Sequence, residues 1–176
     1  LIIAKSDEAV VTWENEIKEW TPDLRYASLV DSSTADKWKA WGDAEDGLFI
    51  ATYNGLAWML SRLAYDPKKE RNKLQPDKKR VSAFAKRIQA FVSDEATDVA
   101  NSRALISRLC RQLTKTCPIR YELAGVPVGR DPTILWHQMF LIDRGETLGA
   151  TLGLYRQAFF DQKKNHWGGF DYKFDK

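Results

Sequence analysis

Apolar residues in this chain fall into short runs, separated by longer stretches in which apolar positions recur at helical spacing. Five runs have the length and character of buried strands: residues 1–4, 25–30, 48–52, 88–93 and 119–124. Helical patterns lie between these runs, and regular alternation of strands and helices is typical of a parallel sheet. The pattern therefore predicts an α/β fold in which helices flank a parallel sheet.

Three of the helical patterns predict which side chains face the core. The first helix ends before Pro22, the second covers residues 56–64, and the third covers residues 101–116 as a crossover between the last two strands. The predicted inward residues are Val11, Trp13, Ile17 and Trp20 in the first helix, Trp58, Met59, Leu60 and Leu63 in the second, and Leu105, Ile106, Leu109 and Leu113 in the third. We expect the aromatic residues among them to belong to the core rather than to contact a cofactor.

Two adjacent acids, Asp94 and Glu95, follow the fourth strand-like run almost directly. In a parallel sheet, ligands bind beyond the carboxyl ends of the strands, so acids at this position face a site rather than the core. Nucleotide hydrolysis uses such a pair, because one carboxylate holds Mg²⁺ while the next orients or deprotonates the attacking water. The pair therefore has the arrangement of a Walker B element.

The same four letters, Ser-Asp-Glu-Ala, occur a second time near the start of the chain and provide an internal comparison. There, Lys5 and Ser6 separate Asp7 and Glu8 from the preceding strand, and a helical stripe follows immediately. Acids in the first turn of a helix are favoured by the helix dipole. We therefore interpret Asp7 and Glu8 as helix-start residues and Asp94 and Glu95 as the functional pair.

The length and composition fit one globular domain. The chain has 176 residues, of which 44% are hydrophobic and 29% charged, and no apolar run approaches the roughly 18 residues that a membrane span requires. We expect no membrane partner and no signal peptide, and a cytoplasmic or nucleoid-associated location, or a nuclear one in a eukaryote. The two cysteines, Cys110 and Cys117, match no disulfide framework and no zinc pattern with His137 and His166.

Two segments differ in composition from the rest of the chain. Residues 66–87 contain nine Lys or Arg against three acids, which indicates an insertion-like, solvated segment. It either contacts a phosphate backbone or is simply an exposed face, and the net charge of +3 does not demonstrate nucleic-acid binding. Residues 161–176 form an aromatic, polar tail, for which packing on a further region is favoured over base stacking.

The order of these elements resembles the first RecA-like lobe of Swi/Snf-type ATPases, within the superfamily-two DEAD/DEAH helicase-like proteins. The resemblance covers residues 1–160 and extends from motif Ia to beyond motif III. The matching blocks are Leu1-Ile2-Ile3-Ala4 with the helix Trp13-Glu14-Asn15-Glu16, Ile50-Ala51-Thr52-Tyr53-Asn54 for motif Ib, Asp94-Glu95-Ala96-Thr97 for Asp-Glu-Ala-His, and Leu123-Ala124-Gly125-Val126-Pro127 for Leu-Thr-Gly-Thr-Pro. Leu135-Trp136 and Tyr155-Arg156 continue it downstream.

The resemblance implies a role for each matching position. Asp94 would position the Mg²⁺ of ATP, and Glu95 would activate the hydrolytic water. Coupling of hydrolysis to movement would involve Thr97, Gly125 and Pro127. Contacts along a nucleic-acid track would come from Lys5, Ser6, Thr52, Tyr53 and Asn54, although Thr52 and Tyr53 fit an ordinary strand end equally well.

Several positions depart from the family pattern. Thr97 replaces the family's His, and Ala124 and Val126 replace two threonines whose hydroxyls would connect the acid motif to motif III. No Gly-x-x-x-x-Gly-Lys-Ser/Thr phosphate loop occurs in the sequence, and the second RecA-like lobe is absent. We therefore expect the isolated chain not to hydrolyse ATP appreciably, and activity to require a longer polypeptide with an upstream phosphate loop and a second lobe.

On this reading the chain is a fragment of an ATP-dependent DNA translocase that tracks duplex DNA, with ATP and Mg²⁺ as its cofactors. The alternative is a catalytically inactive helicase-like module that binds DNA or a protein partner. The retained acid pair favours the motor, because two adjacent acids repel each other unless a cation is present. The lost hydroxyls favour the inactive module.

Overall fold

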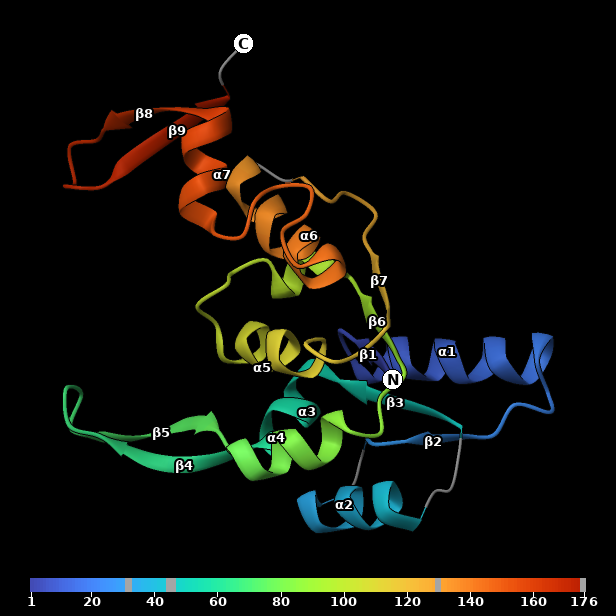
Figure 1. Ribbon diagram of the computed structural model, residues 1–176. Coiled ribbons are helices and arrows are strands. Elements are labelled where there is room, and N and C mark those ends of the chain that lie inside the picture. The colour runs from blue at the N-terminus through green and yellow to red at the C-terminus, as the bar shows by residue number, and fades with distance from the viewer. Residues whose placement is uncertain (31–32, 44–46, 129–130, 175–176) are drawn as a thin grey trace.

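A five-stranded parallel sheet organises the chain (Figure 1). The structure, a computed structural model, describes residues 1–30, 33–43, 47–128 and 131–174. Its sheet has the order β2-β3-β1-β6-β7, and each pair of neighbouring strands is parallel. The strands are β1 (Ile2–Ala4), β2 (Tyr26–Ser28), β3 (Leu48–Thr52), β6 (Ala90–Asp94) and β7 (Ile119–Leu123). The predicted fold class and the five predicted strands are confirmed.

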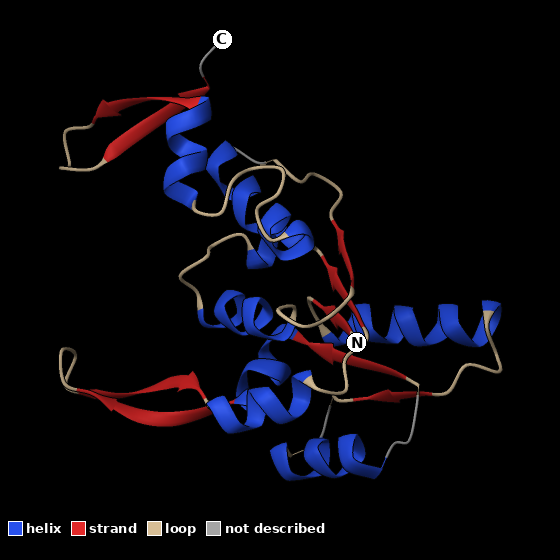
Figure 2. Cartoon of the chain, viewed as in Figure 1, coloured by secondary structure: helices blue, strands red, loops and turns tan. Residues whose placement is uncertain are grey.

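Helices cover both faces of the sheet, and two separate hairpins lie outside it (Figure 2). The helices are α1 (Asp7–Trp20), α2 (Thr34–Asp43), α3 (Tyr53–Leu60), α4 (Lys78–Ala85), α5 (Leu105–Leu113), α6 (Leu135–Asp143) and α7 (Leu152–Phe159), with 3₁₀ turns at Ala96–Val99 and Pro132–Ile134. The hairpins are β4 (Ser61–Asp66) with β5 (Arg71–Pro76), and β8 (Phe160–Lys164) with β9 (Phe170–Phe174). No described helix combines the length and apolarity needed to cross a membrane.

The two faces of the sheet have separate cores, because successive strand residues point to opposite sides. On one face, Ile2, Ala4 and Ile50 pack against Val10 and Ile17 of α1. On the other face, the strands and the helices α2, α3, α4 and α5 form the larger core. It contains Ile3, Phe49, Ala51 and Phe91 from the strands and Trp41, Leu56, Leu60, Phe84 and Leu109 from the helices. Trp41 stacks on Phe84 with ring centroids 3.8 Å apart, which joins α2 to α4.

The first helix begins where the sequence predicts, but its buried stripe differs from the prediction. The Ser6 hydroxyl caps the helix by accepting from the Ala9 amide at 3.4 Å, and Asp7 and Glu8 lie in the first turn. Val11 and Trp20, predicted to face inward, are 52% and 72% exposed. A helix of 14 residues is about 21 Å long, twice the length of a three-residue strand, so its last turn extends beyond the sheet.

The second predicted helix ends earlier than expected. It stops at Leu60, and residues 61–66 form strand β4 instead. Met59 and Leu60 are buried as predicted, but Trp58 and Leu63 are 56% and 61% exposed, so their prediction as inward residues is wrong. Pairing with β5 overrides the helical pattern here.

The basic segment at residues 66–87 is not wholly solvated. Its first part forms the turn and second strand of the β4–β5 hairpin, and its remainder is α4, which Asp77 caps by accepting from the amides of Lys79 and Arg80. Val81 and Phe84 of α4 are buried in the main core. The cations of this helix therefore lie on the outer side of a structural element that belongs to the lobe.

Truncating Phe84 to alanine is expected to lower the free energy of unfolding by about 3–5 kcal/mol, because the side chain is fully buried and leaves a cavity. Truncating the exposed Trp20 to alanine is expected to change it by less than about 0.5 kcal/mol. Urea denaturation of both variants measures the difference. A large loss of stability in Trp20→Ala would contradict the exposed position of this residue.

Candidate functional site

The sheet brings several of the predicted site residues to one edge. Asp94 is the last residue of β6, which lies between β1 and β7. Because these strands are parallel and in register, with Ala4 opposite Thr52 and Asp94 opposite Leu123, their carboxyl ends lie together. The residues that follow the strands therefore meet at this edge, and Lys5 Nζ lies 3.8 Å from Asp98 Oδ1 there.

Asp94 is held by two residues that come from opposite faces of the sheet. The indole Nε1 of Trp13, on α1, donates to Asp94 Oδ2 at 2.9 Å. The hydroxyl of Tyr53, at the start of α3, donates to the Asp94 backbone carbonyl at 2.8 Å and also lies 2.7 Å from Ser93 Oγ. These contacts fix the backbone and one carboxylate oxygen and leave Oδ1 without a hydrogen bond to any described residue.

Glu95 turns the chain sharply away from the strand. Its backbone adopts the left-handed conformation with φ +59°, a position that costs a non-glycine residue about 1 kcal/mol or more. A 3₁₀ turn at Ala96–Val99 follows, and the Thr97 hydroxyl donates to Glu95 Oε1 at 2.7 Å. Thr97, a predicted coupling residue, therefore orients the Glu95 carboxylate directly.

The end of this turn is anchored by a buried carbonyl. The Val99 carbonyl accepts from Ser107 Oγ at 2.9 Å, and His137 Nδ1 lies 2.6 Å from the same oxygen. Burial lowers the pKa of His137 to about 4, so the ring is neutral at pH 7 and donates through Nδ1. His137 thus has a structural role here, fixing the acid-bearing loop to α6.

A third carboxyl group, besides those of Asp94 and Glu95, lies beside the site, and the sequence analysis did not single it out. Glu122 of β7 is paired with Ser93 in the sheet register, and both of its carboxylate oxygens are buried. Burial raises the pKa of Glu122 to about 8, an effect that the nearby Ser93 partly opposes, so the group is mainly protonated at neutral pH. The sequence signal that could have indicated it is the position of an acid between two apolar residues, Tyr121 and Leu123, within a predicted strand.

The five residues predicted for a nucleic-acid track differ in accessibility. Lys5 and Asn54 are exposed. The hydroxyls of Ser6 and Thr52 cap α1 and α3, with Thr52 Oγ1 accepting from the Gly55 amide at 3.1 Å. Tyr53 is only 5% exposed, and its hydroxyl supports Asp94 from within the core; its place along a nucleic-acid track stays a prediction.

The two predicted turn residues after β7 are both exposed. A Cβ added at Gly125 would have no neighbour within 4 Å, and Gly125 is not among the residues with positive φ, so no steric reason requires glycine in this state. The Pro127 carbonyl accepts from Gln138 Nε2 at 3.0 Å and connects the turn to α6. Since Val99 is also bonded to α6, this helix contacts both loops beside the acids.

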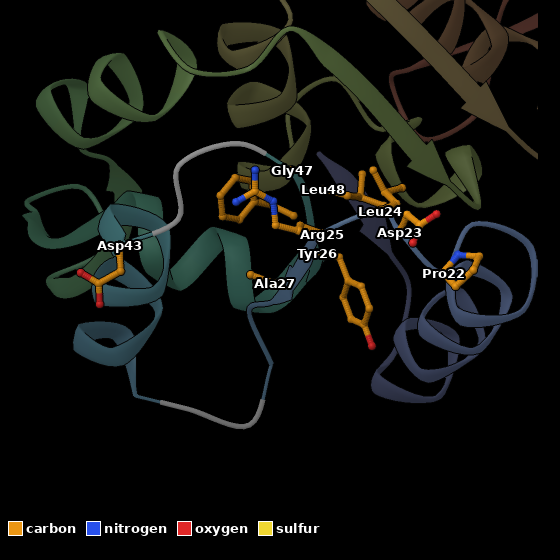
Figure 3. Close-up of a pocket in the computed structure, with 10 residues that line it drawn as sticks. Pro22, Asp23, Leu24, Arg25, Tyr26, Ala27, Asp43, Gly47 and Leu48 are labelled. Atoms are coloured by element: carbon orange, nitrogen blue, oxygen red, sulfur yellow. The ribbon is translucent and has the colours of Figure 1, made fainter.

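The pocket shown in Figure 3 lies away from these residues. It is lined by the amino-terminal ends of β2 and β3 with the preceding loops, at the opposite edge of the sheet from Asp94. Ligands of parallel sheets bind at the carboxyl ends of the strands. We therefore assign the candidate site to the acid-bearing edge rather than to this pocket.

Comparison with known proteins identifies the family. The model of the SNF2-related domain matches residues 1–159, which is most of the chain. The chain belongs to the SNF2-related domain family. The Swi/Snf-type resemblance of the sequence motifs is thereby confirmed.

A solved structure of the Sulfolobus solfataricus SWI2/SNF2 ATPase core in complex with dsDNA has the same fold. It aligns with a TM-score of 0.60 at 19% identity, over 90% of this chain and 27% of that one. The SNF2-related chain thus spans about a quarter of the length of that ATPase core. No curated protein matches the chain.

Buried Glu122 is expected to give this SNF2-related domain a distinct pH dependence of stability. Its pKa is raised from 4.5 to about 8 on folding, so the folded state holds a proton that the unfolded state releases between these pH values. The contribution of Glu122 to the free energy of unfolding is therefore fully present below pH 4.5. The contribution is lost as the pH rises towards 8. We expect Glu122→Gln to flatten the fall in unfolding free energy between pH 5 and about 8.

Urea denaturation across this pH range measures the effect. Glu19→Gln, at an exposed position on α1, is the control and should follow the wild-type curve. Parallel curves for wild type and Glu122→Gln would contradict the buried, protonated state of Glu122.

Proposed function

We propose that this SNF2-related domain is part of the first motor lobe of an ATP-dependent translocase on duplex DNA, in which Asp94 and Glu95 perform the nucleotide chemistry. The observation that supports this most strongly is the position of the two acids. They follow β6 at the edge where parallel sheets bind ligands, and Trp13, Tyr53 and Thr97 orient them individually.

The donor set fits an Mg²⁺–ATP substrate. Mg²⁺ in nucleotide sites is bound by one or two carboxylates together with phosphates and water, so it does not need a cage of protein ligands. Among the residues that the structure describes, no group of three or more His, Cys, Asp or Glu is placed to hold a metal ion. Asp94 Oδ1 would contact the ion or its water shell while Trp13 holds Oδ2.

Glu95 would act on the attacking water. The Thr97 hydroxyl donates to Oε1, which leaves Oε2 to accept a hydrogen bond from water. As the water oxygen bonds to the γ-phosphorus and the bond to the β–γ bridging oxygen breaks, Glu95 accepts the water proton. The two acids differ in backbone conformation, because Asp94 is the last residue of β6 and Glu95 is left-handed with φ +59°.

The nucleic-acid track would use the neighbouring strand ends. Lys5 and Asn54 are exposed beyond β1 and β3, and backbone groups at the start of α3, whose first turn has no acid, would supply further donors to phosphate. Lys5 also pairs with Asp98 in the acid-bearing loop, so it connects this track to the hydrolysis site. Contacts of this kind grip the backbone without reading sequence, as a translocase requires.

Strand β7 forms a lateral edge of the sheet, and its exposed apolar residues support the proposal that this domain is part of a longer motor protein. Among the described residues, β7 pairs only with β6, and Ile119, Tyr121 and Leu123 on it are 47%, 58% and 41% exposed. An exposed apolar edge strand normally pairs with another strand or is covered. A strand of the longer polypeptide, carrying the phosphate loop, would pair here, and a second lobe would supply the remaining groups of the site.

One observation favours the alternative of a catalytically inactive module that binds DNA or a protein. The Thr97 hydroxyl bonds to Glu95 within the acid motif, and Ala124 and Val126 of motif III have no hydroxyl group. The described residues therefore show no side-chain hydrogen bond between the two motifs. A module of this kind would bind DNA in a salt-dependent way that ignores ATP.

The decisive substitution is Glu95→Gln in the full-length polypeptide that contains this domain. We expect DNA-stimulated ATPase activity to fall by about 10²–10⁴-fold, because the base is lost while ATP binding is retained. The matched control is Glu8→Gln, which changes the same residue in the repeated Ser-Asp-Glu-Ala sequence at an exposed helix start. Equal DNA-stimulated ATPase activity in Glu95→Gln and wild type would contradict the proposal that Glu95 acts in a motor.

Trp13 is expected to act as a positioning residue for Asp94. Trp13→Phe keeps an aromatic ring but removes a hydrogen bond to a charged group, worth about 1.5–3 kcal/mol. The Mg²⁺ concentration for half-maximal ATPase activity should rise by about tenfold or more. Trp20→Phe, on the exposed end of the same helix, is the control. An unchanged Mg²⁺ dependence in Trp13→Phe would rule out this role.

A further inference from the structure

The β4–β5 hairpin is a separate element that the nucleotide site does not use. It joins the end of α3 to the start of α4, and the Asp77 amide closes its base by donating to the Leu60 carbonyl at 2.9 Å. In Figure 1 it extends at the left of the molecule, with its turn farthest from the sheet. Glu70 in this turn has φ +48°, and Asp66 Oδ1 accepts from the Lys68 amide at 3.1 Å, which shapes the tight reversal.

The register of the hairpin separates its side chains into two unlike faces. Residues directly opposite in an antiparallel pair share a face, and alternate residues switch faces. Leu63 pairs with Leu74 and Tyr65 with Asn72, which gives one largely apolar face. The opposite face carries the pairs Arg62–Gln75, Ala64–Lys73 and Asp66–Arg71, so three of its six side chains are cationic and one is acidic.

The positive charge of the chain is concentrated around this second face. Residues 61–80 contain eight Lys or Arg against three Asp or Glu, an excess of five, whereas the whole chain has a net charge of only +3. The rest of the chain is therefore net negative. A local field of this sign attracts polyanions even though the whole-chain charge is small.

The basic face continues onto the start of α4. Arg62 and Gln75 line a common pocket with Lys78 and Lys79, and the acid there, Asp77, is already engaged by the amides that it caps and by Arg80 Nε at 3.9 Å. Within the described parts of the chain, Arg62, Arg71 and Lys73 form no ion pair. All three side chains are exposed, so their charges are available to a ligand.

We infer that this basic face, formed by Arg62, Arg71 and Lys73 with Lys78 and Lys79, is a second contact surface for the phosphate backbone of duplex DNA. The inference rests on the proposed function. The track residues Thr52 and Asn54 begin α3, and the hairpin begins where α3 ends, about 12 Å further on. Strands of six residues add about 20 Å, a span that covers several phosphates of a duplex.

The salt dependence of DNA binding tests this surface. The slope of log K against log salt is negative, and each lost phosphate contact makes it less steep by about 0.9. The triple variant Arg62→Gln, Arg71→Gln, Lys73→Gln should therefore have a slope that is less steep by about 2.7. The loss should be equal for duplexes of unrelated sequence, because backbone contacts do not read bases. Binding is measured on the full-length polypeptide without nucleotide, and circular dichroism verifies that the variants fold.

The second hairpin provides a matched control, since β8 and β9 also form a two-stranded antiparallel pair with exposed lysines. Lys163→Gln, Lys164→Gln, Lys173→Gln removes the same charge and should retain a slope closer to that of wild type. Equal loss in both triple variants would overturn the inference, since it would reflect net charge alone. An unchanged slope in the β4–β5 variant would also overturn it. The same variant is tested for binding to a polyglutamate peptide: loss of peptide binding with DNA binding intact would mean that the face binds an acidic protein, and would overturn the inference as well.

Failure of this inference is distinguishable from failure of the proposed function. An unchanged DNA slope in the β4–β5 variant, together with loss of ATPase activity in Glu95→Gln, would remove the hairpin surface and leave the motor in place. Absence of any salt-dependent DNA binding by the wild-type polypeptide would overturn both.

Discussion

The parallel pairing of β6 with β1 on one side and β7 on the other is the constraint on which the site depends. It places Asp94 at the same sheet edge as the ends of β1, β3 and β7. Residues that are far apart in sequence, such as Lys5 and Asp98, therefore meet in one loop cluster. A slip of one residue in this register would turn Asp94 to the opposite face and separate it from Trp13.

The acid-bearing loop is held from both faces of the sheet and from the region that follows it. Trp13 reaches it from α1, Tyr53 from α3, and His137 from α6. Buried and partly buried hydrogen bonds of this kind favour a unique arrangement, because a polar group that is removed from water and left unpaired loses more than it gains when paired. The loop carries the left-handed Glu95 as a consequence of these fixed points on both sides of it.

The sequence predicted the centre of the sheet well, because the buried strands β1 and β3 appear as continuous apolar runs whose ends are sharp. It also predicted that Asp94 and Glu95 lie at the carboxyl end of such a run, and the structure has them there. It misplaced Val11, Trp20, Trp58 and Leu63. Helical periodicity does not show where a helix passes beyond the sheet, as at Trp20, or where strand pairing replaces the helix, as at Leu63. The burial of Tyr53 was not predicted, because strand-end position alone does not tell which side an aromatic side chain takes. Glu122 stood out only as an acid within strand β7, and the sequence did not show that its carboxyl group is buried beside Ser93.

The central claim is that Asp94 and Glu95 act on the γ-phosphate of Mg²⁺–ATP while the lobe is bound to DNA. A crystal or cryo-electron microscopy structure of the full-length polypeptide, with duplex DNA and a non-hydrolysable Mg²⁺–nucleotide, tests it most directly. We expect Mg²⁺ or its water shell at Asp94 Oδ1, and a water between Glu95 and the γ-phosphate. Nucleotide bound at another end of the sheet, or bound with both acids directed away from it, would contradict these roles of Asp94 and Glu95.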